Sequence, residues 1–432
     1  MAEPSVAPAR LCAYRVIRRV FEHGAYTDRA LAAEAAGLDA RDRALAMRLA
    51  YGTVQRRMTL DAIAQQLAAR SLQRLHPGAR AALRLGLYQL LYAHGVAEHA
   101  AVNETVELAK PLGAGAAGFL NAVLRRAARE APALVEGLGD ETPAAAAVKH
   151  SVPDWLAQQF WQELGPEQAR ALLQACNEPA ESALRVNTLV ATAAEVAAAL
   201  PVPVRPAPGI PEGLVLAGPF DIQGSAQWRR GAIMGQSRGS MAVARTVDPQ
   251  PGERVLDLCA APGAKTTHLA ALMADRGEIV AVERHPGRAR ALARTCERMG
   301  ARSVRVERAD AARHRSGSLF GRVLLDPPCS GLGTLQSRPD VRWRTGPTQI
   351  AQLAQLQRRM LESAAGATAP QGRLVYSVCT ISAAETTGVI EAFLDEHPDF
   401  VLEEATQLLP HRERTDGFYI GRLRRTSTLR AG

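Results

Sequence analysis

Residues 254–283 read RVLDLCAAPGAKTTHLAALMADRGEIVAVE, and this stretch decides the fold that we expect for the C-terminal part of the chain. It contains an apolar run, a turn with Pro262 and Gly263, a helical stretch and a second apolar run. Two nearly continuous apolar strands joined by a helix predict parallel strands in a sheet that helices cover on both faces. The alternation continues in SVRVERAD, RVLLDPP and GRLVYSVCT, so we expect an α/β domain over residues 236–432.

The rest of the chain predicts two further domains. Residues 10–130 are rich in Ala, Leu and Arg, with apolar residues at helical spacing, which predicts an all-α bundle over residues 1–140. The Ala-, Gly- and Pro-rich stretch 131–147 is typical of a linker. Helical stretches then mix with short strand-like pieces and a Pro-rich segment, which predicts a small α+β connecting domain over residues 145–235.

Composition narrows the class of protein. The chain of 432 residues is too long for one ordinary core. No apolar run approaches the ~20 residues that span a bilayer, and no signal-peptide pattern is present, so we expect a cytoplasmic protein without membrane contact. Six scattered cysteines without a CxxC pair argue against a disulfide framework and a zinc site. The net charge of +9 and the pI of about 9.6 favour a polyanionic partner.

Arginine is the usual cation of this chain. Of the 52 basic residues, 49 are arginine and three are lysine, so each lysine is of interest. Some arginines recur on polar faces of the predicted bundle, where they are either solvated surface or contacts for nucleic acid. These are Arg15, Arg18, Arg19, Arg56, Arg57, Arg125, Arg126 and Arg129.

Acidic side chains accompany four successive predicted strands. In sheets of this kind, ligands bind beyond the carboxyl ends of the strands. The turn at Gly263 opens a helix and presents backbone N–H groups to a ligand, although neither the P-loop spacing nor GxGxxG is present. Acids at such positions suit ribose hydroxyls, an adenine amino group and a sulfonium, which favours S-adenosylmethionine as cofactor. The four acids are Asp257, Glu283, Asp310 and Asp326.

Cysteines lie at or just after the ends of two predicted strands. Cys379 lies near the end of LVYSVCT, and Cys329 follows Asp326 and two prolines in LLDPPCSG. If these strands are parallel neighbours, both thiols lie beside the carboxylate. This set suits methyl transfer to C5 of cytosine, because a thiolate that adds to C6 makes C5 nucleophilic and a carboxyl group stabilises the ring charge. A helix beginning near Ser382 would activate the thiol. The base must leave its stack, which favours unpaired or looped RNA.

Three segments, DLCAAPGAKT, DPPCSG and YSVCT, resemble the central motifs of the RNA cytosine-C5 methyltransferase family of the Fmu/Sun type. Residues 184–189, 338–344 and 416–425 are similar to further segments of that family. The helical start, with AYGTVQRR and LRLGLYQLLY, resembles the NusB-like domain of its bacterial small-subunit (16S) rRNA branch. The resemblance spans nearly the whole chain and implies a NusB-like RNA-binding bundle, a small connecting domain and a Rossmann-like methyltransferase domain.

The resemblance also implies roles for particular residues. Cys379 is the expected nucleophile, Cys329 the expected aid to release of the methylated RNA, and Asp326 the expected contact of the cytosine ring. Within the cofactor set, Glu283 is expected at the ribose and Asp310 at the adenine. The expected contacts of S-adenosylmethionine are Cys259, Ala260, Ala261, Pro262, Gly263, Ala264, Lys265, Glu283, Asp310 and Asp326. We expect a monomer, without a metal, acting on an unpaired or looped segment of free small-subunit rRNA or of an early assembly intermediate.

Some positions depart from the family pattern and keep two alternatives open. One alternative is a non-catalytic rRNA-binding or assembly factor that retains the fold. The other is a DNA cytosine-C5 methyltransferase, in which Cys329 of the Pro-Cys pair attacks and Cys379 has no role; the helical start and the second cysteine favour RNA. The departures are Ser237, Arg238, Ala264, Gln336, Ser337 and Thr386.

Overall fold

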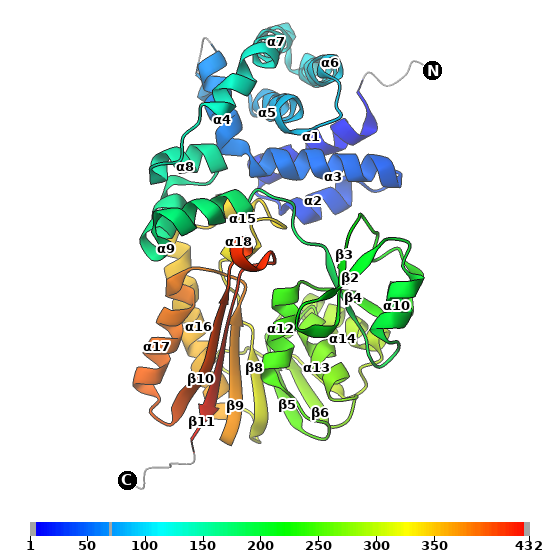
Figure 1. Cartoon of the computed structure of the whole chain (residues 1–432), viewed down its shortest axis with the longest axis vertical. Helices are drawn as coiled ribbons and strands as arrows, with labels where there is room; N and C mark the ends of the chain where they lie inside the picture. The colour runs from blue at the N-terminus through cyan, green and yellow to red at the C-terminus, as the bar shows by residue number, and fades with distance from the viewer. Residues whose placement is uncertain (1–5, 69–70, 427–432) are drawn as a thin grey trace. The chain divides into compact units, whose positions relative to one another are not determined.

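The structure, a computed structural model, describes residues 6–68 and 71–426 (Figure 1). The chain divides into two compact units. The first unit comprises Met1–Glu178 together with Leu335–Arg344, and the second comprises Pro179–Thr334 and Thr345–Gly432. The first is helical, and the second contains both sheets. A ten-residue segment from the middle of the C-terminal half therefore belongs to the helical unit.

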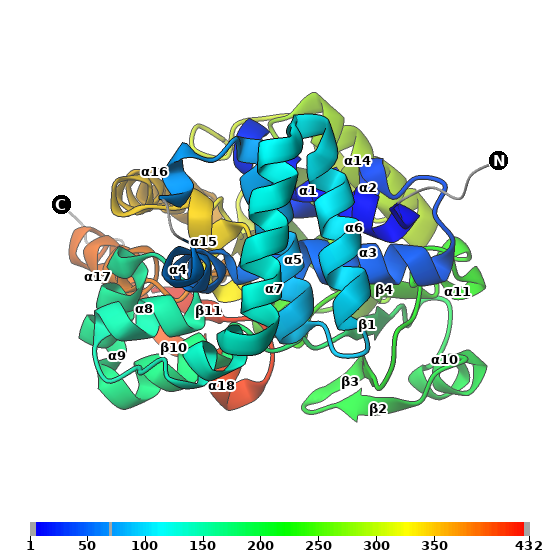
Figure 2. The ribbon, with the colours of Figure 1, turned by 90° about the horizontal axis from the view of Figure 1, so that it is seen from above.

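The helical unit is built around its fifth α-helix. Its helices are α1 (Pro8–His23), α2 (Thr27–Glu34), α3 (Ala40–Gln55), α4 (Arg57–Leu67), α5 (Pro77–Tyr92), α6 (Glu98–Ala109), α7 (Ala114–Glu136), α8 (Pro143–His150), α9 (Asp154–Ala175) and α15 (Val341–Arg344), with short 3₁₀ turns at Leu72–Arg74 and Lys110–Leu112. α5 is buried over most of its circumference and contacts α1, α3, α4, α6 and α7, of which α6 and α7 run side by side in Figure 2. Gly52 of α3 leaves space for the ring of Tyr88, where a Cβ would clash.

The stretch predicted as a linker is mostly helical, so that prediction was wrong. α7 continues through Pro132 to Glu136, and α8 begins at Pro143, which leaves only residues 137–142 outside the helices. A proline inside a helix removes one hydrogen bond. The helix continues because Ala131 is fully buried and the following apolar side chains pack against the core. Thr142 accepts a hydrogen bond from the N–H of Ala145 and caps α8.

The segment Leu335–Arg344 is fixed in the helical unit by a buried arginine. The guanidinium of Arg342 donates hydrogen bonds to the carbonyl oxygens of Ser151 and Cys176 and to Oδ1 of Asn177, at 3.0, 3.1 and 3.0 Å. Trp343 donates its indole N–H to the carbonyl oxygen of Val54 at 2.7 Å. Because an arginine fork satisfies several acceptors at once, Arg342 makes more hydrogen bonds to the helical unit than Trp343 does.

The second unit begins with a small antiparallel sheet in the order β2-β3-β1-β4. Its elements are β1 (Ala183–Val186), α10 (Ala193–Ala199), β2 (Val204–Ala207), β3 (Ile210–Leu216), α11 (Ala226–Arg229) and β4 (Ile233–Gly235). One face packs against α10 and α11 through a core that includes Leu184 and Leu214. The other face contacts Met241, which comes from the next helix of the unit.

The large sheet has seven strands in the order β10-β11-β9-β8-β5-β6-β7. The strands are β5 (Arg254–Leu258), β6 (Glu278–Val282), β7 (Val304–Glu307), β8 (Phe320–Leu325), β9 (Thr368–Val378), β10 (Phe400–Leu408) and β11 (Phe418–Arg425). β7, β6, β5, β8 and β9 are parallel, whereas β11 and β10 join as antiparallel strands at one edge. This topology confirms the expected Rossmann-like sheet and the expected parallel pairing of β8 with β9.

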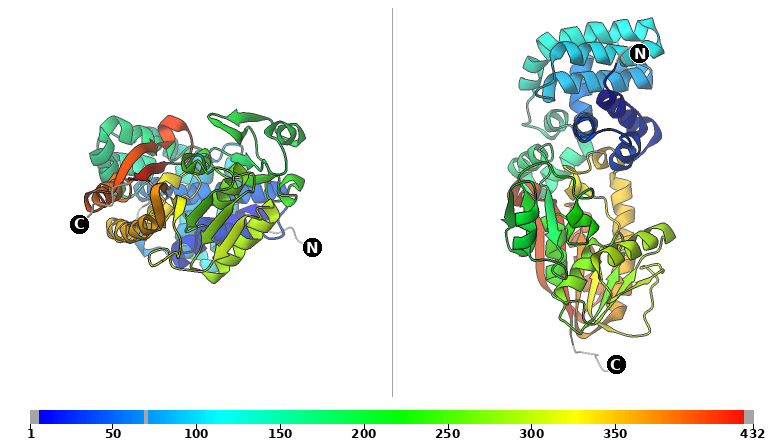
Figure 3. Two further views of the ribbon diagram at one scale, coloured as in Figure 1. Left: turned by 90° about the horizontal axis from the view of Figure 1, so that it is seen from below. Right: turned by 90° about the vertical axis from the view of Figure 1, so that its right-hand side faces the viewer.

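Helices cover both faces of the large sheet (Figure 3). They are α12 (Arg238–Val247), α13 (Ala264–Leu272), α14 (Pro286–Met299), α16 (Pro347–Ala367) and α17 (Thr387–Glu396). The unit also contains α18 (Pro410–Glu413), between β10 and β11 in the chain, and 3₁₀ turns at Leu332–Thr334 and Ala383–Glu385. Successive strand residues alternate between two cores. Val255 packs with α12, α13 and α14, whereas Leu256 packs with α16 and α17. Strands buried on both faces explain the continuous apolar runs.

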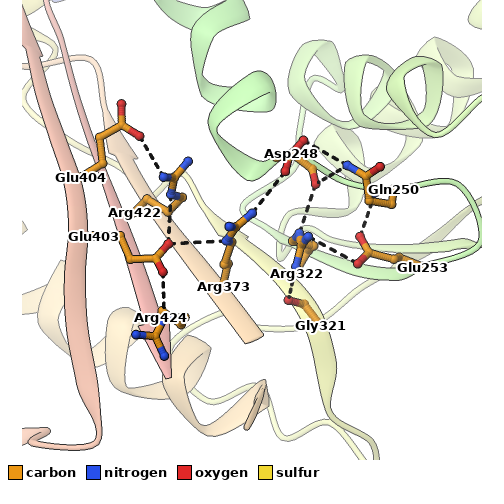
Figure 4. Close-up of polar contacts among 10 residues, drawn as sticks. All are labelled: Asp248, Gln250, Glu253, Gly321, Arg322, Arg373, Glu403, Glu404, Arg422 and Arg424. Atoms are coloured by element: carbon orange, nitrogen blue, oxygen red, sulfur yellow. Dashed lines mark hydrogen bonds and ion pairs between the residues drawn. The ribbon is translucent and has the colours of Figure 1, made fainter. Parts of the chain in front are cut away.

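A chain of ion pairs crosses β8, β9, β11 and β10 (Figure 4). Arg373 bridges Asp248 and Glu403 at 3.2 and 3.5 Å, and Glu403 also pairs with Arg422 and Arg424 at 3.2 and 2.8 Å. These three arginines are therefore neutralised locally by acids of neighbouring elements. Of the helices within residues 6–68 and 71–426, none is both long and apolar enough to cross a membrane.

Candidate active site

The carboxyl ends of the parallel strands gather most of the predicted site residues at one edge of the large sheet. Cys259 follows β5, Glu283 follows β6, Asp326 follows β8, and Cys379 follows β9. Asp310 lies three residues beyond the end of β7, where its carboxylate accepts the backbone N–H of Ala312 at 3.0 Å. The rest of the cofactor set, residues 260–265, forms the turn that leads into α13.

Two sulfur atoms meet at this edge. The Sγ atoms of Cys329 and Cys379 lie 3.4 Å apart, within hydrogen-bonding distance for thiols. The hydrogen bond to Cys379 and burial both raise the pKa of the Cys329 thiol well above its ordinary value. Cys329 therefore keeps its proton and can donate it to the sulfur of Cys379. This arrangement stabilises negative charge on Cys379, as a nucleophile requires.

The carboxylate of Asp326 is held by two side chains. Lys265 donates from Nζ to Oδ2 at 2.7 Å, and Ser377 donates from Oγ to Oδ1 at 2.9 Å. Burial alone would lower the pKa of Lys265, but the charges of Asp326 and Cys379 raise it above the ordinary value. Lys265 therefore stays a charged ammonium beside the Asp326 carboxylate. The sequence placed Lys265 only near the cofactor turn and gave no sign of its ion pair.

A buried acid, which sequence reasoning missed, connects the two cysteine loops. Glu385 accepts the backbone N–H of Ser330 at 2.8 Å and the side-chain amide of Gln357 at 3.0 Å. The hydroxyl of Tyr376 donates to the backbone oxygen of Glu385 at 2.7 Å. Burial raises the pKa of Glu385 above its ordinary value, and the hydrogen bonds to its carboxylate offset only part of this increase. The only sequence signal was an acid six residues after Cys379.

The helix expected near Ser382 begins elsewhere, so that prediction was wrong. Ser382 precedes a single 3₁₀ turn, Ala383–Glu385, and α17 begins at Thr387. Thr386 breaks the helix with φ of −115° and ψ of −100° and donates its hydroxyl to the carbonyl oxygen of Ser382 at 3.0 Å. No α-helix therefore begins at Ser382 to present its N-terminus to the thiols.

Asp257 does not lie at a strand tip, as the sequence had suggested. It lies within β5, fully enclosed, and its Oδ2 accepts the hydroxyl of Thr266 at 2.7 Å. Its Oδ1 has no hydrogen-bond partner. Burial raises the pKa of Asp257 to about 7. The acid therefore supports the turn from within the core, and the edge itself carries three of the four acids.

The turn after β5 requires a glycine, because its backbone is left-handed and packs closely against α14. Gly263 has φ of 104°, which favours glycine, and a Cβ there would lie 2.9 Å from Leu292. Ala264 is the first residue of α13 and is compatible with the helix, so this departure from the family pattern leaves the turn intact. Glu283 is buried beside the turn, where it accepts the N–H of His285 at 2.8 Å and pairs with Arg288 at 3.2 Å.

The departures at residues 237 and 238 make structural contacts. The hydroxyl of Ser237 accepts the N–H of Ser240 and caps α12. Arg238 donates to Oε1 of Glu181 at 2.7 Å and to the carbonyl oxygen of Glu413 at 2.6 Å. They hold α12 next to the small sheet, so their replacement of family residues does not disrupt the fold.

The remaining departures are also accommodated. In the helical unit, the side-chain amide of Gln336 donates to the carbonyl oxygen of Ala175 at 2.9 Å. Ser337 lies exposed in the same segment. Thr386 closes the turn before α17, as described above. None of these six departures removes a cysteine or an acid of the sheet edge.

Several arginines of the helical unit are engaged by its own side chains. Arg18 pairs with Glu22 at 2.8 Å, and Arg126 pairs with Glu130 at the same distance. The guanidinium of Arg57 lies over the rings of Phe21 and Trp343 at 5.1 and 5.0 Å. The charges of Arg18 and Arg126 are thus partly neutralised by acids, and Arg57 is occupied by two rings, so fewer arginines are available for nucleic acid than the sequence suggests. Across the described part of the chain, no cluster of three or more His, Cys, Asp or Glu is arranged to hold a metal ion.

Three family descriptions match this chain: 16S rRNA methyltransferase RsmB/F over residues 244–424, the NusB family over 7–129, and the ferredoxin-like domain of RsmF/B-like methyltransferases over 152–223. A probable ribosomal RNA small subunit methyltransferase B from Synechocystis is 36% identical, covering 96% of this chain and 99% of the relative. The ribosomal RNA small subunit methyltransferase B of Thermus thermophilus is also 36% identical, covering 90% of each chain. The chain belongs to the RsmB/F family of 16S rRNA methyltransferases.

A solved structure supports the same assignment across the whole chain. The crystal structure of PH0851 superposes with a TM-score of 0.82 at 28% identity and covers 98% of this chain and 99% of its own. The expected order of a NusB-like bundle, a connecting domain and a Rossmann-like methyltransferase domain is confirmed. This RsmB/F family member is an RNA methyltransferase of the small ribosomal subunit. The family therefore argues against both alternatives that the sequence left open, a non-catalytic rRNA-binding factor and a DNA methyltransferase.

Proposed function

We propose that this enzyme methylates C5 of a cytosine in 16S rRNA with S-adenosylmethionine as methyl donor, through a covalent bond between Cys379 and C6 of the base. The observation that carries this proposal is the meeting of two thiols, 3.4 Å apart, beside a carboxylate that Lys265 holds. A methyltransferase that acted on an already nucleophilic nitrogen or oxygen would need neither thiol. C5 of cytosine does need a thiol, because covalent addition at C6 creates the nucleophile.

The carboxylates and backbone N–H groups at the sheet edge suit S-adenosylmethionine. The carboxylates of Glu283 and Asp310 are acceptors for ribose hydroxyls and for the adenine amino group. The turn 259–265, with its glycine and the start of α13, brings backbone N–H groups toward the ligand. S-adenosylmethionine supplies the methyl group when it is bound. No step below requires a metal.

The chain's own residues carry the covalent steps. The sulfur of Cys379 forms a bond to C6, and the electron pair of the C5–C6 double bond makes C5 nucleophilic. Asp326, oriented by Lys265 and Ser377, contacts the cytosine ring, and as the protonated acid it donates a hydrogen bond to N3 and stabilises the negative charge that builds there. After methyl transfer, the C5 proton leaves to a base, the double bond forms again and the bond from sulfur to C6 breaks. Cys329 assists this release step.

The substrate segment is unpaired or looped RNA, because a base within a helix must first be extruded at a cost of a few kcal/mol. We propose that the enzyme acts in the cytoplasm, as a monomer, on free 16S rRNA or on an early assembly intermediate. The relatives named above are methyltransferases of this rRNA, which supports the substrate class.

The test combines binding with transfer. Isothermal titration of the full chain with S-adenosylmethionine measures cofactor binding. Tritium transfer from methyl-labelled cofactor to a 16S rRNA transcript, followed by bisulfite sequencing, identifies the product and its position. We expect binding and 5-methylcytosine at one site. Cofactor binding without 5-methylcytosine in any rRNA would overturn the proposal.

A further inference from the structure

The helical unit contains a pocket that none of the expected catalytic or cofactor residues lines. Its volume is about 230 Å³, which is below the ~300–1,000 Å³ of pockets for drug-sized ligands and suits a single flat group such as a nucleobase. The walls come from the start of α2, from α3 and from the segment Leu335–Arg344. The lining residues are Tyr26, Asp28, Arg29, Tyr51, Ser337, Arg338, Asp340 and Val341.

A buried carboxylate in this pocket has an acceptor without a donor. Asp340 is only 3% exposed, and its Oδ2 has no hydrogen-bond partner. The nearest cation, Nε of Arg344, lies 4.0 Å from that oxygen, which is too long for a hydrogen bond. An unsatisfied buried acceptor normally destabilises a protein by about 1–3 kcal/mol. A ligand that brings N–H donors would remove this penalty.

The position of Asp340 is fixed before any ligand binds. Arg342, two residues further along, is fully buried and donates to the oxygens of Ser151, Cys176 and Asn177. Trp343 is anchored by its own hydrogen bond to the carbonyl oxygen of Val54. The unpaired oxygen is therefore held by rigid surroundings, as a binding group should be.

Flat and cationic groups surround the carboxylate. The ring of Tyr26 is 45% exposed, and the guanidinium groups of Arg344 and Arg29 lie 3.9 and 4.9 Å from its centroid. Tyrosine rings and guanidinium planes are the surfaces on which unpaired bases stack in RNA complexes. Arg29 and Arg338 are exposed at the pocket and suit phosphate groups.

A second tyrosine adds a donor. Burial and the neighbouring charges of Asp28 and Asp340 raise the pKa of Tyr51 to about 12. Its hydroxyl stays protonated at neutral pH and can donate a hydrogen bond to a ring nitrogen or a carbonyl oxygen of a base. The pocket thus offers carboxylate acceptors and a hydroxyl donor on a half-buried wall, with aromatic and guanidinium surfaces at its opening.

We propose that this pocket binds one unpaired guanine of the 16S rRNA substrate, separately from the cytosine that is methylated. Guanine presents two adjacent N–H donors, N1–H and the N2 amino group, which match the two oxygens of a carboxylate such as Asp340. Cytosine and adenine present only one amino group on the same edge. The proposal rests on the rRNA substrate, and it gives the helical unit a specific contact in addition to its general positive charge.

Cross-linking tests the location and the base. The full chain is bound to a 16S rRNA transcript and irradiated with ultraviolet light, and nucleotide-bearing peptides are identified by mass spectrometry. We expect a guanosine monophosphate adduct on the peptide with Tyr26 or on the one with Tyr51. Adducts elsewhere in the protein without one on these peptides, or an adduct there with a different base, would overturn the proposal.

Kinetics of matched variants test the carboxylate. Asp340→Asn keeps the shape but replaces one acceptor with an amide donor, so KM for the transcript should rise about tenfold, more than kcat changes. Glu136→Gln makes the same change of charge at an exposed position at the end of α7 and should leave KM as it is. Tyr26→Leu, at an exposed ring, should also raise KM. Unchanged KM in both pocket variants would overturn the proposal.

The outcomes separate this inference from the proposed reaction. If the unmodified enzyme methylates the transcript and the pocket variants keep its KM, the pocket proposal fails and the reaction stands. If the unmodified enzyme methylates no rRNA, the proposed reaction fails, and the cross-link still decides whether guanine occupies the pocket. Asp340→Asn loses no hydrogen bond of that oxygen but leaves its new amide N–H groups without an acceptor, so its melting temperature should fall only slightly, and KM is measured where the variant remains folded.

Discussion

The sulfur atoms of Cys329 and Cys379 lie 3.4 Å apart, although fifty residues separate them in the chain. β8 and β9 are parallel neighbours, so the residues that follow them meet at the same edge. The two thiols share a hydrogen bond. Either thiol can donate in this hydrogen bond, and the raised pKa of Cys329 favours Cys329 as donor and Cys379 as acceptor, in line with the proposed role of Cys379 as nucleophile.

The two cysteines should therefore behave differently when each is removed. Cys329→Ala removes both the hydrogen bond to Cys379 and the release group, so the attack should slow but release should slow more, and a covalent complex of protein and rRNA should accumulate in the presence of S-adenosylmethionine. Cys379→Ala should form no complex and transfer no methyl group. Denaturing gel electrophoresis with labelled rRNA measures both. Cys12→Ala, at a buried thiol of the helical unit, is the control and should resemble the unmodified enzyme. The opposite pattern would exchange the two roles.

Lys265 should be required for the chemical step. Lys265→Met removes the ammonium that orients Asp326 and favours negative charge on Cys379, so kcat should fall about 100-fold or more. Lys149→Met is the matched control, because Lys149 pairs with Asp140 at 3.0 Å near the surface of the helical unit. Single-turnover tritium transfer measures the effect. A higher KM for rRNA with kcat unchanged would instead mean that Lys265 only binds the substrate.

Local features of the sequence predicted the sheet and its edge. Apolar strands, the glycine turn and intervening helices have short-range signatures, and right-handed crossover connections restrict how such strands pair. The adjacency of Cys329 and Cys379 followed from these features. The contact between Lys265 and Asp326 did not, because 61 residues separate them and no periodicity reports which side chains point together.

Predictions failed where tertiary packing overrode composition. The stretch 131–147 looked like a linker because of its glycines and prolines, but burial of Ala131 keeps α7 helical through Pro132. Asp257 looked like an edge acid, but its strand continues one residue further and encloses it. The inclusion of Leu335–Arg344 in the helical unit depends on buried hydrogen bonds of Arg342 to residues far along the chain, which no local pattern reveals.

The buried Asp257 should make stability fall as the pH rises. Its pKa is raised from 3.8 to about 7, so the folded protein keeps a proton that the unfolded chain loses. The stability that this proton provides is complete below pH ~4 and is lost as the pH rises to about 7, by on the order of 4 kcal/mol. Asp257→Asn cannot ionise. The melting temperature of Asp257→Asn minus that of the unmodified protein should therefore increase as the pH rises from 5 to 8.

The test depends on how the difference between the two melting temperatures changes with pH, not on either melting temperature alone. The amide that Asp257→Asn introduces lacks a partner at the site of Oδ1, which adds a penalty that is constant with pH. Asp221→Asn is the control, because Asp221 is an exposed turn residue whose oxygen accepts the N–H of Gly224 and can do so as an amide. Parallel melting curves for Asp257→Asn and the unmodified protein across this range would show that Asp257 is ionised in the folded state at every pH.

Arg342 should hold the segment Leu335–Arg344 in the helical unit. Arg342→Met leaves the carbonyl oxygen of Ser151 without its donor, at a cost of about 1–3 kcal/mol, and leaves that of Cys176 with only the side-chain amide of Gln55. Hydrogen exchange should become faster in residues 335–344 and in the peptide around Cys176, while the strands of the large sheet keep their protection. Arg342→Lys should recover only part of the protection, because an ammonium cannot reproduce the planar fork. Arg41→Met, at an exposed position of α3, should exchange like the unmodified protein. Unchanged exchange in Arg342→Met would mean that Trp343 alone anchors the segment.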